Sequence, residues 1–308
     1  MGDASDIRWQ PDCVVLLRDG VVTEYDDPDD AFADADTAGD VILIPPGEWT
    51  LTTGYSLTDV SIVGLGGGPG DCVLKSTMSS STTLLDMNGS CTLFNFTIDW
   101  QIASSSGTTH YALKLGVSCQ TYFVNIDLEI ASGSSHAQGM QTTGITRQCV
   151  VHVTTDSGNS TGIDAAGNEV MQDCEGVATT DSGIAKGLMA NDIPEKLPVK
   201  DCVGYGKTTG TGTAYGLFFG GFPISEVHIG DSWFTGDTYD VGGIKSEAHF
   251  NSVKYETTNL TDGATIVHEA GDRAGKGRAD TITGQWVFEA LAGLAFKDAT
   301  ELTIAGGV

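Results

Sequence analysis

The sequence predicts an all-β protein in which similar coils of chain stack along one axis as a solenoid. Three observations predict this fold: a recurring cysteine, segments that alternate apolar and polar residues, and Ser/Thr/Gly-rich turns between those segments. The cysteines recur every 19 to 30 residues, at Cys72, Cys91, Cys119, Cys149, Cys174 and Cys202. Similarity at such a period is typical of repeats that bury their apolar sides against each other.

The segments that follow the cysteines resemble one another and alternate like strands. CTLFNFTID begins at Cys91, CQTYFVNID at Cys119, CVVHVTTDSG at Cys149 and CEGVATTDSG at Cys174. Alternation with a period of two residues indicates β-strands. One coil is therefore expected to hold roughly 25–30 residues in two or three short strands, stacked on the next coil at about 4.8 Å.

The cysteines themselves are expected to be structural. The chain has seven of them and no CxxC pair, whereas zinc sites need closely spaced ligands. Stacked side chains that point in parallel directions have poor disulfide geometry. We therefore expect buried free thiols, one per coil, that mark the register of the repeat.

The N-terminal region combines a strand with a short helix. Val14–Gly20 reads as a strand that ends in a turn, and Asp27–Asp40 reads as a helix with Pro28 in its first turn. Such a helix suits a cap over the open end of a solenoid. Further strands are expected within Asp40–Leu51 and Leu57–Leu74, where the second segment contains a glycine-rich turn.

The N-terminal region resembles the opening of right-handed parallel β-helix proteins of the pectate-lyase-like superfamily, which includes viral tailspikes. The resemblance lies in the helix and in the two segments DVILIPPGEWTL and LTDVSIVGLGGGPGDCVL. The resemblance covers Pro28–Leu74 and implies a single-stranded right-handed parallel β-helix with a short N-terminal capping helix. The expected organisation is a strand and capping helix over 1–40, the β-helix over 41–270, and a C-terminal coil or cap over 271–308 that could contact another subunit. The fold hosts lyases, hydrolases and adhesins alike, so it does not define a function.

The composition is strongly acidic. The chain has 41 acidic and 15 basic residues, a net charge of −26, and such a chain repels nucleic acid. Scattered acids indicate either adaptation to high salt or a calcium-binding surface; we favour salt adaptation, similar to that of haloarchaeal proteins. No apolar run is long enough to cross a membrane, and the first residues lack the pattern of a secretory signal.

Four aspartates occur at similar distances from their cysteines. Asp99 and Asp127 lie eight residues after theirs, and Asp156 and Asp181 lie seven after theirs. A shared register would stack these carboxylates on adjacent coils, where they could bind a structural cation (Ca, Na or K) or form a paired-carboxylate glycosidase site. We favour a third alternative, in which Asp begins a turn and accepts backbone N–H bonds. No other cofactor is expected.

An aromatic cluster is the candidate ligand-binding surface: Tyr215, Phe218, Phe219, Phe222 and Trp233. Phe218 and Phe219 are adjacent in an expected strand, so one of them should face outward. Exposed aromatic residues mark binding surfaces, such as platforms for sugars or contacts between subunits, while core packing remains the alternative.

The sequence lacks the catalytic motifs of the enzymes in this superfamily. Asn125 and Asp127 fit the Asn-x-Asp of the polygalacturonase-like branch, but its Gly-His-Gly is absent and paired Asp residues occur only near the N-terminal helix. The pectate-lyase branch needs a basic residue as its base, and Arg147 is the single arginine within the repeats. We therefore predict no catalytic residues.

Three functions are compatible with these observations. The favoured one is a virion-surface protein (tail fibre, spike or capsid-surface protein) that attaches to a host envelope glycan or glycoprotein without cleaving it. The alternatives are a polysaccharide lyase or glycoside hydrolase on the same scaffold, and a structural oligomerisation module. The expected partners are other virion proteins and identical subunits, with a homotrimer implied by the resemblance. The expected location is the virion, after synthesis in the host cytoplasm.

Salt dependence tests the charge argument. Dialysis from molar salt to low ionic strength should unfold the protein, because the Debye length grows from about 3 Å at 1 M to about 30 Å at 0.01 M and exposes the acids to their mutual repulsion. Circular dichroism during dialysis measures the loss of strand signal, and an unchanged spectrum would contradict salt adaptation.

Overall fold

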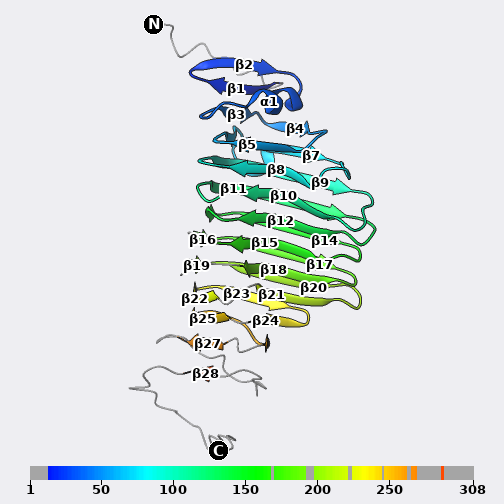
Figure 1. Ribbon diagram of the computed structural model, residues 1–308, viewed down its shortest axis with the longest axis vertical. Helices are drawn as coiled ribbons and strands as arrows, with labels where there is room; N and C mark the ends of the chain where they lie inside the picture. Colours follow the sequence, from blue (N-terminus) through cyan, green and yellow to red (C-terminus); the bar gives the residue numbers. More distant parts are fainter. Residues whose placement is uncertain are drawn as a thin grey trace, which may run out of the picture.

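The computed structural model is a parallel β-solenoid, which confirms the predicted fold class (Figure 1). The structure describes residues 13–167, 170–191, 198–220, 224–244, 246–261, 265–268 and 286–287. Strands stack in three columns, and each strand pairs in parallel with its equivalents in the coils before and after it. Right-handed coiling stays a prediction, and the predicted C-terminal cap over 271–308 lies outside the described residues except for 286–287.

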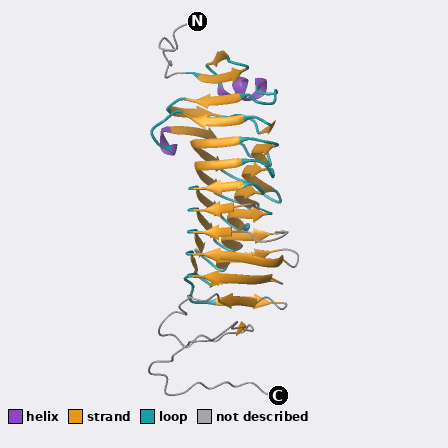
Figure 2. Cartoon of the chain, turned by 90° about the vertical axis from the view of Figure 1, so that its left-hand side faces the viewer, coloured by secondary structure: helices purple, strands orange, loops and turns teal. Residues whose placement is uncertain are grey.

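Two columns form one large sheet and the third forms a separate sheet of nine described strands (Figure 2). The first column contains β3 (Val41–Ile44), β6 (Ser61–Gly64), β13 (Ile145–Arg147), β16 (Val170–Gln172), β19 (Pro198–Lys200), β22 (Ile224–Gly230), β25 (Ser246–Asn251), β27 (Thr265–His268) and β28 (Trp286–Val287). The second contains β4 (Gly47–Thr50), β7 (Cys72–Ser76), β14 (Val150–Thr155), β17 (Glu175–Thr180), β20 (Val203–Thr208) and β23 (Trp233–Gly236). The long strands β9 (Thr92–Ile102) and β11 (Gln120–Ile130) run through both columns.

The third column faces the other two across the core. It contains β5 (Tyr55–Thr58), β8 (Thr83–Asn88), β10 (Thr109–Leu115), β12 (His136–Thr142), β15 (Ser160–Ala166), β18 (Ile184–Asn191), β21 (Thr213–Gly220), β24 (Tyr239–Ile244) and β26 (Thr258–Thr261). The predicted coil of two or three short strands is therefore confirmed.

An antiparallel hairpin covers the first coil. The predicted strand is present as β1 (Val14–Arg18), but it is followed by β2 (Val21–Tyr25), which the sequence analysis missed. β1 also pairs antiparallel with β3, so the first strand of the solenoid has no open edge. The Arg18 guanidinium, with donor–acceptor distances of 2.9 and 2.7 Å, clamps the buried Asp40 carboxylate and lowers its pKa.

The predicted N-terminal helix is present but shorter than expected, as α1 (Pro28–Asp34). Asp27 caps it by accepting the N–H of Asp29 at 2.9 Å, and Phe32 is buried against the strands. The helix stops where Ala35 leaves the helical conformation. Its function as a cap of the solenoid stays a prediction. No helix in the described residues has the length and apolar character needed to cross a bilayer.

One corner of the coils, between the first and second columns, uses the left-handed backbone conformation. Positive φ values of 46° to 61° occur there at Asn95, Phe123, Gln148, Asp173, Asp201, Asp231 and Ser252. Asp and Asn adopt this conformation more readily than other L-residues, which explains the Asp that precedes Cys174 and Cys202. The corner N–H also joins the coils, as when Asp173 donates to the Lys200 carbonyl at 3.1 Å.

The residue after this corner points into the core and satisfies a backbone carbonyl. The Sγ atoms of Cys149, Cys174 and Cys202 lie 3.1–3.2 Å from the carbonyl oxygen two residues earlier in the chain. Ser232 takes the next place in the same row, and its Oγ donates to the Gly230 carbonyl at 2.7 Å. The cysteine row thus continues as serine in the coil where the sequence pattern ends.

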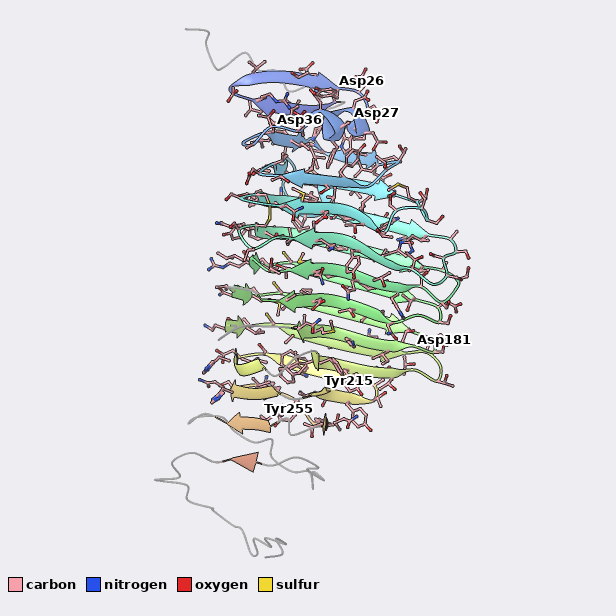
Figure 3. All side chains as sticks on the ribbon, viewed as in Figure 1. Asp26, Asp27, Asp36, Asp181, Tyr215 and Tyr255 are labelled. Carbon is pink, nitrogen blue, oxygen red and sulfur yellow. A yellow bond between two sulfur atoms is a disulfide. The ribbon has the colours of Figure 1, made fainter. Side chains whose placement is uncertain are left out.

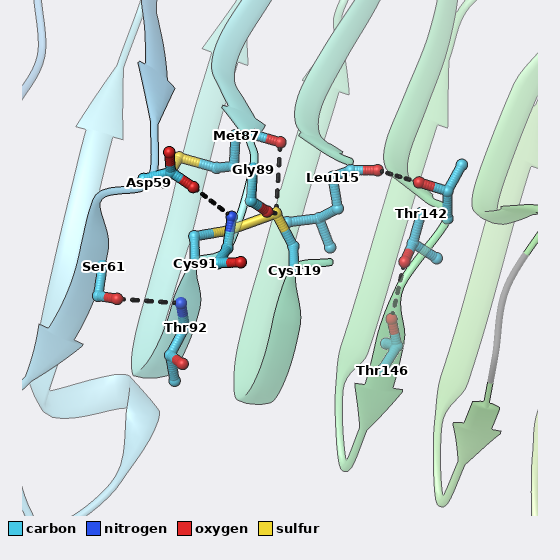
Figure 4. The surroundings of a disulfide bond; sticks show 12 residues. Asp59, Ser61, Met87, Gly89, Cys91, Thr92, Leu115, Cys119, Thr142 and Thr146 are labelled. Carbon is cyan, nitrogen blue, oxygen red and sulfur yellow. Dashed lines mark hydrogen bonds between the residues drawn. A yellow bond between two sulfur atoms is a disulfide. The ribbon is translucent and has the colours of Figure 1, made fainter. Parts of the chain in front are cut away.

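Cys91 and Cys119 belong to a different row, at the corner between the third and first columns (Figure 4). They form a disulfide across neighbouring coils, with Cα atoms 4.6 Å apart, so the prediction of free thiols is wrong for this pair. Each lies one residue before its strand begins, where the side chains are not held parallel by the sheet. The other five cysteines are buried and form no disulfide, as predicted.

Glycines line the third column from β12 to β21. Large side chains fill the core elsewhere, in early coils (Trp100, Phe96) and in late ones (Phe234, Phe250). A Cβ added at Gly162 would collide with the Gly187 carbonyl, and one added at Gly187 would collide with the Tyr205 nitrogen. Backbone therefore packs directly on backbone between β15, β18 and the second-column strands β17 and β20.

Thiol titration tests the two classes of cysteine. The folded protein should not react with a thiol reagent, because the five cysteines outside the disulfide are buried. Burial also raises the pKa of Cys72 and Cys149, which lowers the fraction of the reactive thiolate. Unfolding without reductant should release five thiols, and reduction should bring the total to seven. Seven thiols before reduction would contradict the Cys91–Cys119 bond.

Candidate functional site

The four predicted aspartates do not form one row. Asp99 and Asp127 are register partners on the outer side of β9 and β11, but the next partner of Asp127 is His152. Asp156 lies in the turn after β14, beyond the end of that row. The error arises because Cys119 and Cys149 belong to different corner rows, so that counting from each cysteine shifts the register.

Asp99 and Asp127 form a pair of like charges on adjacent coils. Asp99 accepts a hydrogen bond from Gln101 Nε2 at 2.8 Å and is the register partner of Lys75 in β7. Desolvation raises the pKa of Asp127, the Asp99 charge raises it further, and His152 opposes both effects. In this row, two carboxylates that repel each other therefore lie between Lys75 and His152.

Asp156 has the turn function that the sequence analysis favoured, and Asp181 lies in the equivalent turn of the next coil but accepts a side-chain hydroxyl. Asp156 Oδ2 accepts the N–H of Gly133 from the preceding coil at 3.3 Å, and Asp181 Oδ1 accepts the Thr209 hydroxyl of the following coil at 3.2 Å. The Asp181 N–H also donates to the Asp156 carbonyl at 2.9 Å. Figure 3 shows Asp181 at the edge of the stack, where the turns lie.

Within the described ranges, no group of three or more His, Cys, Asp or Glu side chains is arranged to hold a metal ion. Cation binding by these four aspartates stays a prediction. The aspartates lie as two separate pairs, Asp99 with Asp127 and Asp156 with Asp181.

The predicted aromatic cluster divides between two surfaces and the core. Phe219 is buried in the core, and Phe222 lies outside the described residues. Trp233 is 49% exposed on the second column, where its ring lies 6.1 Å from that of Tyr205. Tyr215 and Phe218 lie together on the third column with ring centroids 5.0 Å apart. The prediction that Phe218 and Phe219 face opposite sides is confirmed.

The outer side of the third column combines aromatic, charged and amide side chains, and we call it the third-column face. Its members are Tyr111, Lys114, Gln138, Gln141, Thr161, Asp164, Lys186, Met189, Tyr215, Phe218 and Tyr239, which occupy two rows along the axis. The side chains between them, such as Ile163 and Leu188, fill the core.

Aromatic rings dominate the C-terminal end of the third-column face. The Tyr215 and Tyr239 rings stack on adjacent coils at 5.7 Å with an interplanar angle of 25°, and Phe218 meets Tyr215 edge to face. Asn259 Nδ2 lies 3.4 Å from the Tyr215 hydroxyl. Figure 3 labels Tyr215 over the middle of the strands, away from the turns. Tyr215 is only 8% exposed between its neighbours, so the partly buried Phe218 and Tyr239 provide most of the accessible aromatic surface.

Polar and charged groups occupy the middle of the same face. Asp164 is only 1% exposed although it lies on the outer side of β15, and Gln141 Nε2 donates to its Oδ2 at 3.3 Å. Gln138 Oε1 is buried and has no hydrogen-bond partner among the described residues. Burial raises the pKa of Tyr111, and the Asp164 charge raises it further. A buried carboxylate and an unpartnered amide oxygen are typical of sites that bind polar ligand groups.

Two hollows lie elsewhere on the described surface. One, of about 340 Å³, borders the Cys91–Cys119 disulfide and has a mixed lining that includes Ser90, Val117 and Ile145. The other, of about 250 Å³, includes His228 and His249, whose rings stack with centroids 4.8 Å apart. Neither combines aromatic surface with a buried charge, so the third-column face is the stronger candidate.

The sequence analysis found Tyr215 and Phe218 but missed their polar neighbours. A signal was present, because an outward residue directly precedes a core glycine in four successive coils: Gln138-Gly139, Thr161-Gly162, Lys186-Gly187 and Tyr215-Gly216. Aligning on these glycines instead of the cysteines would have brought the third-column face together.

No known protein family, curated protein or solved structure matches this chain. The fold and the third-column face therefore carry the functional argument.

Replacement of Asp127 by Asn should stabilise the protein at about pH 7 and have no such effect at about pH 3. The folded carboxyl has a raised pKa, so its charge destabilises the fold increasingly as the pH rises through that pKa, whereas at low pH folded and unfolded chains are both protonated. Urea unfolding at both pH values measures the difference, which we expect to be about 0.5 kcal/mol for this exposed pair.

Molar salt provides a control for the same variant. Salt screens the repulsion between Asp99 and Asp127 but does not remove the cost of burying the Asp127 charge. The stabilisation by Asp127→Asn at neutral pH should therefore become smaller in molar salt without vanishing. An equal gain at about pH 3 would show that the Asp127→Asn substitution acts through packing and not through charge.

Proposed function

We propose that this protein is a β-solenoid that binds glycans on its third-column face and attaches a virus particle to a host surface. The supporting observation is the combination on one face of stacked Tyr215 and Tyr239, the edge-to-face Phe218 and the buried Asp164. Aromatic rings pack against the apolar sides of sugars, and carboxylate and amide groups bind their hydroxyls.

The geometry of the stack suits a linear ligand. Successive coils repeat at about 4.8 Å, close to the length of one extended pyranose unit. A glycan aligned with the solenoid axis would therefore present one sugar to each coil from β12 to β24. Such a chain would contact the partly exposed Gln138, Lys186 and Tyr239, with the buried Thr161 and Tyr215 completing the same row.

The virion location, the homotrimer and the salt-adapted host belong to the same proposal. They rest on the sequence resemblance to viral tailspikes and on the net charge of −26. At high ionic strength this charge would not hinder approach to an acidic envelope, because the Debye length is short.

Glycan-array binding in molar salt tests the proposal, with Phe218→Ala and Tyr239→Ala as variants. Each should weaken glycan binding about tenfold, because each removes ring surface from the platform. Tyr122→Ala is the matched control, since Tyr122 is a partly buried tyrosine of the first column whose hydroxyl bonds Gln120. Trp233→Ala reports on the second aromatic surface.

The measurement also separates the alternatives. Release of new reducing ends from a bound glycan would show that the protein is a hydrolase, and release of unsaturated sugars would show that it is a lyase; either result would overturn the proposal of attachment without cleavage. Absence of glycan binding, with a stable oligomer in solution, would favour the structural oligomerisation module.

A further inference from the structure

The third-column face contains a lysine whose ammonium group has only weak partners. Lys186 lies in the middle of β18, between its register partners Thr161 and Tyr215, and its side chain is partly buried. The nearest groups to its Nζ are the Met189 thioether sulfur at 3.3 Å and the Phe218 ring, whose centroid is 4.4 Å away. A thioether is a weak acceptor, and an ammonium group has three donors.

The rest of the chain makes this environment unusual. The described ion pairs join Arg18 to Asp36 and Asp40, Lys75 to Glu48, and Lys200 to Asp201; none includes Lys186. A protein with 41 acidic and 15 basic residues has ample carboxylates with which to pair a lysine. Asp164 lies near enough to favour the charged ammonium, but burial has the larger effect and lowers the Lys186 pKa.

A partly desolvated cation of this kind is costly to hold without a counter-ion. The cation–π contact with Phe218 is of a weakly stabilising kind and leaves the other side of the ammonium free to donate. No described residue offers this Nζ a hydrogen-bond acceptor stronger than the Met189 sulfur, so its remaining donors are available to solvent or to a bound ligand.

We propose that the glycan bound on the third-column face is acidic, with a sugar carboxylate or sulfate ester bound by Lys186 Nζ. This inference rests on the proposed function and names the ligand class of the same site. The sugar ring that carries the anion would lie beside Phe218, and the neighbouring uncharged sugar would contact Tyr239, which stacks on the buried Tyr215. Asp164 repels a second negative charge, so one anionic group per few sugars fits better than a fully charged chain.

Lys114 provides a matched control, because it lies in β10, outside the span from β12 to β24 that the glycan would cover. It lies four strands earlier in the third-column order than Tyr215, and its Nζ is 5.0 Å from the centroid of the Tyr111 ring. Lys114 therefore has the same charge and a similar aromatic neighbour, but it lies outside the Tyr215–Phe218–Tyr239 platform.

The test is calorimetric titration with three oligosaccharides of equal length in about 1 M salt: one containing glucuronate, its sulfated equivalent, and the uncharged glucose form. The native protein should bind one of the anionic forms at least about tenfold more tightly than the uncharged form. Lys186→Met should abolish that preference, Lys186→Arg should keep most of it, and Lys114→Met should leave it unchanged. Melting temperatures establish that each variant is folded.

The outcomes distinguish the two proposals. Equal binding of charged and uncharged oligosaccharides by the native protein, or a preference that survives in Lys186→Met, would overturn the acidic ligand and leave glycan binding intact. Failure of the native protein to bind any glycan would overturn both. The relative affinities of the glucuronate and sulfated forms identify which anion Lys186 receives.

Discussion

Parallel hydrogen bonding between successive coils is the interaction on which the rest of this structure depends. β9 and β11 pair without interruption except at the corner residues Asn95 and Phe123, and this register sets which side chains fill the core and which form rows on the surface. Because a slip of one residue would exchange the two sides of a strand, the register also fixes the chemistry of the surface. The Asp99–Asp127 pair and the third-column face are both products of it.

The sequence was sufficient to predict the fold, since alternation in the first and second columns is clear and each corner repeats. The left-handed corner at Asp173 and Asp201, directly before Cys174 and Cys202, was not predicted. The register between repeats was harder to predict, because cysteines occupy two different corners and a serine continues one of the rows. The hairpin strand β2 was missed because it is almost wholly exposed and has no apolar alternation.

The third-column face could not be read from alternation at all. Its strands contain successive core residues, such as Gly162 and Ile163, and the ladder pairing skips the glycine position. An alternation with a period of two therefore does not predict which residues of these strands point outward. The aromatic residues could be found from composition, whereas Asp164 and Lys186 needed coordinates, because a single carboxylate and a single lysine have no distinctive spacing.

The glycines behind the third-column face have a consequence for recognition. Gly162 and Gly187 press the backbone of β15 and β18 onto the second-column strands, which leaves no inner side chains at these positions that could change rotamer. A ligand on the outer side would meet a surface that is already in its bound shape and would lose little entropy in ordering it. The same rigidity limits adaptation to a different ligand, so changes of specificity should arise by exchange of outward residues and not by movement of the strands.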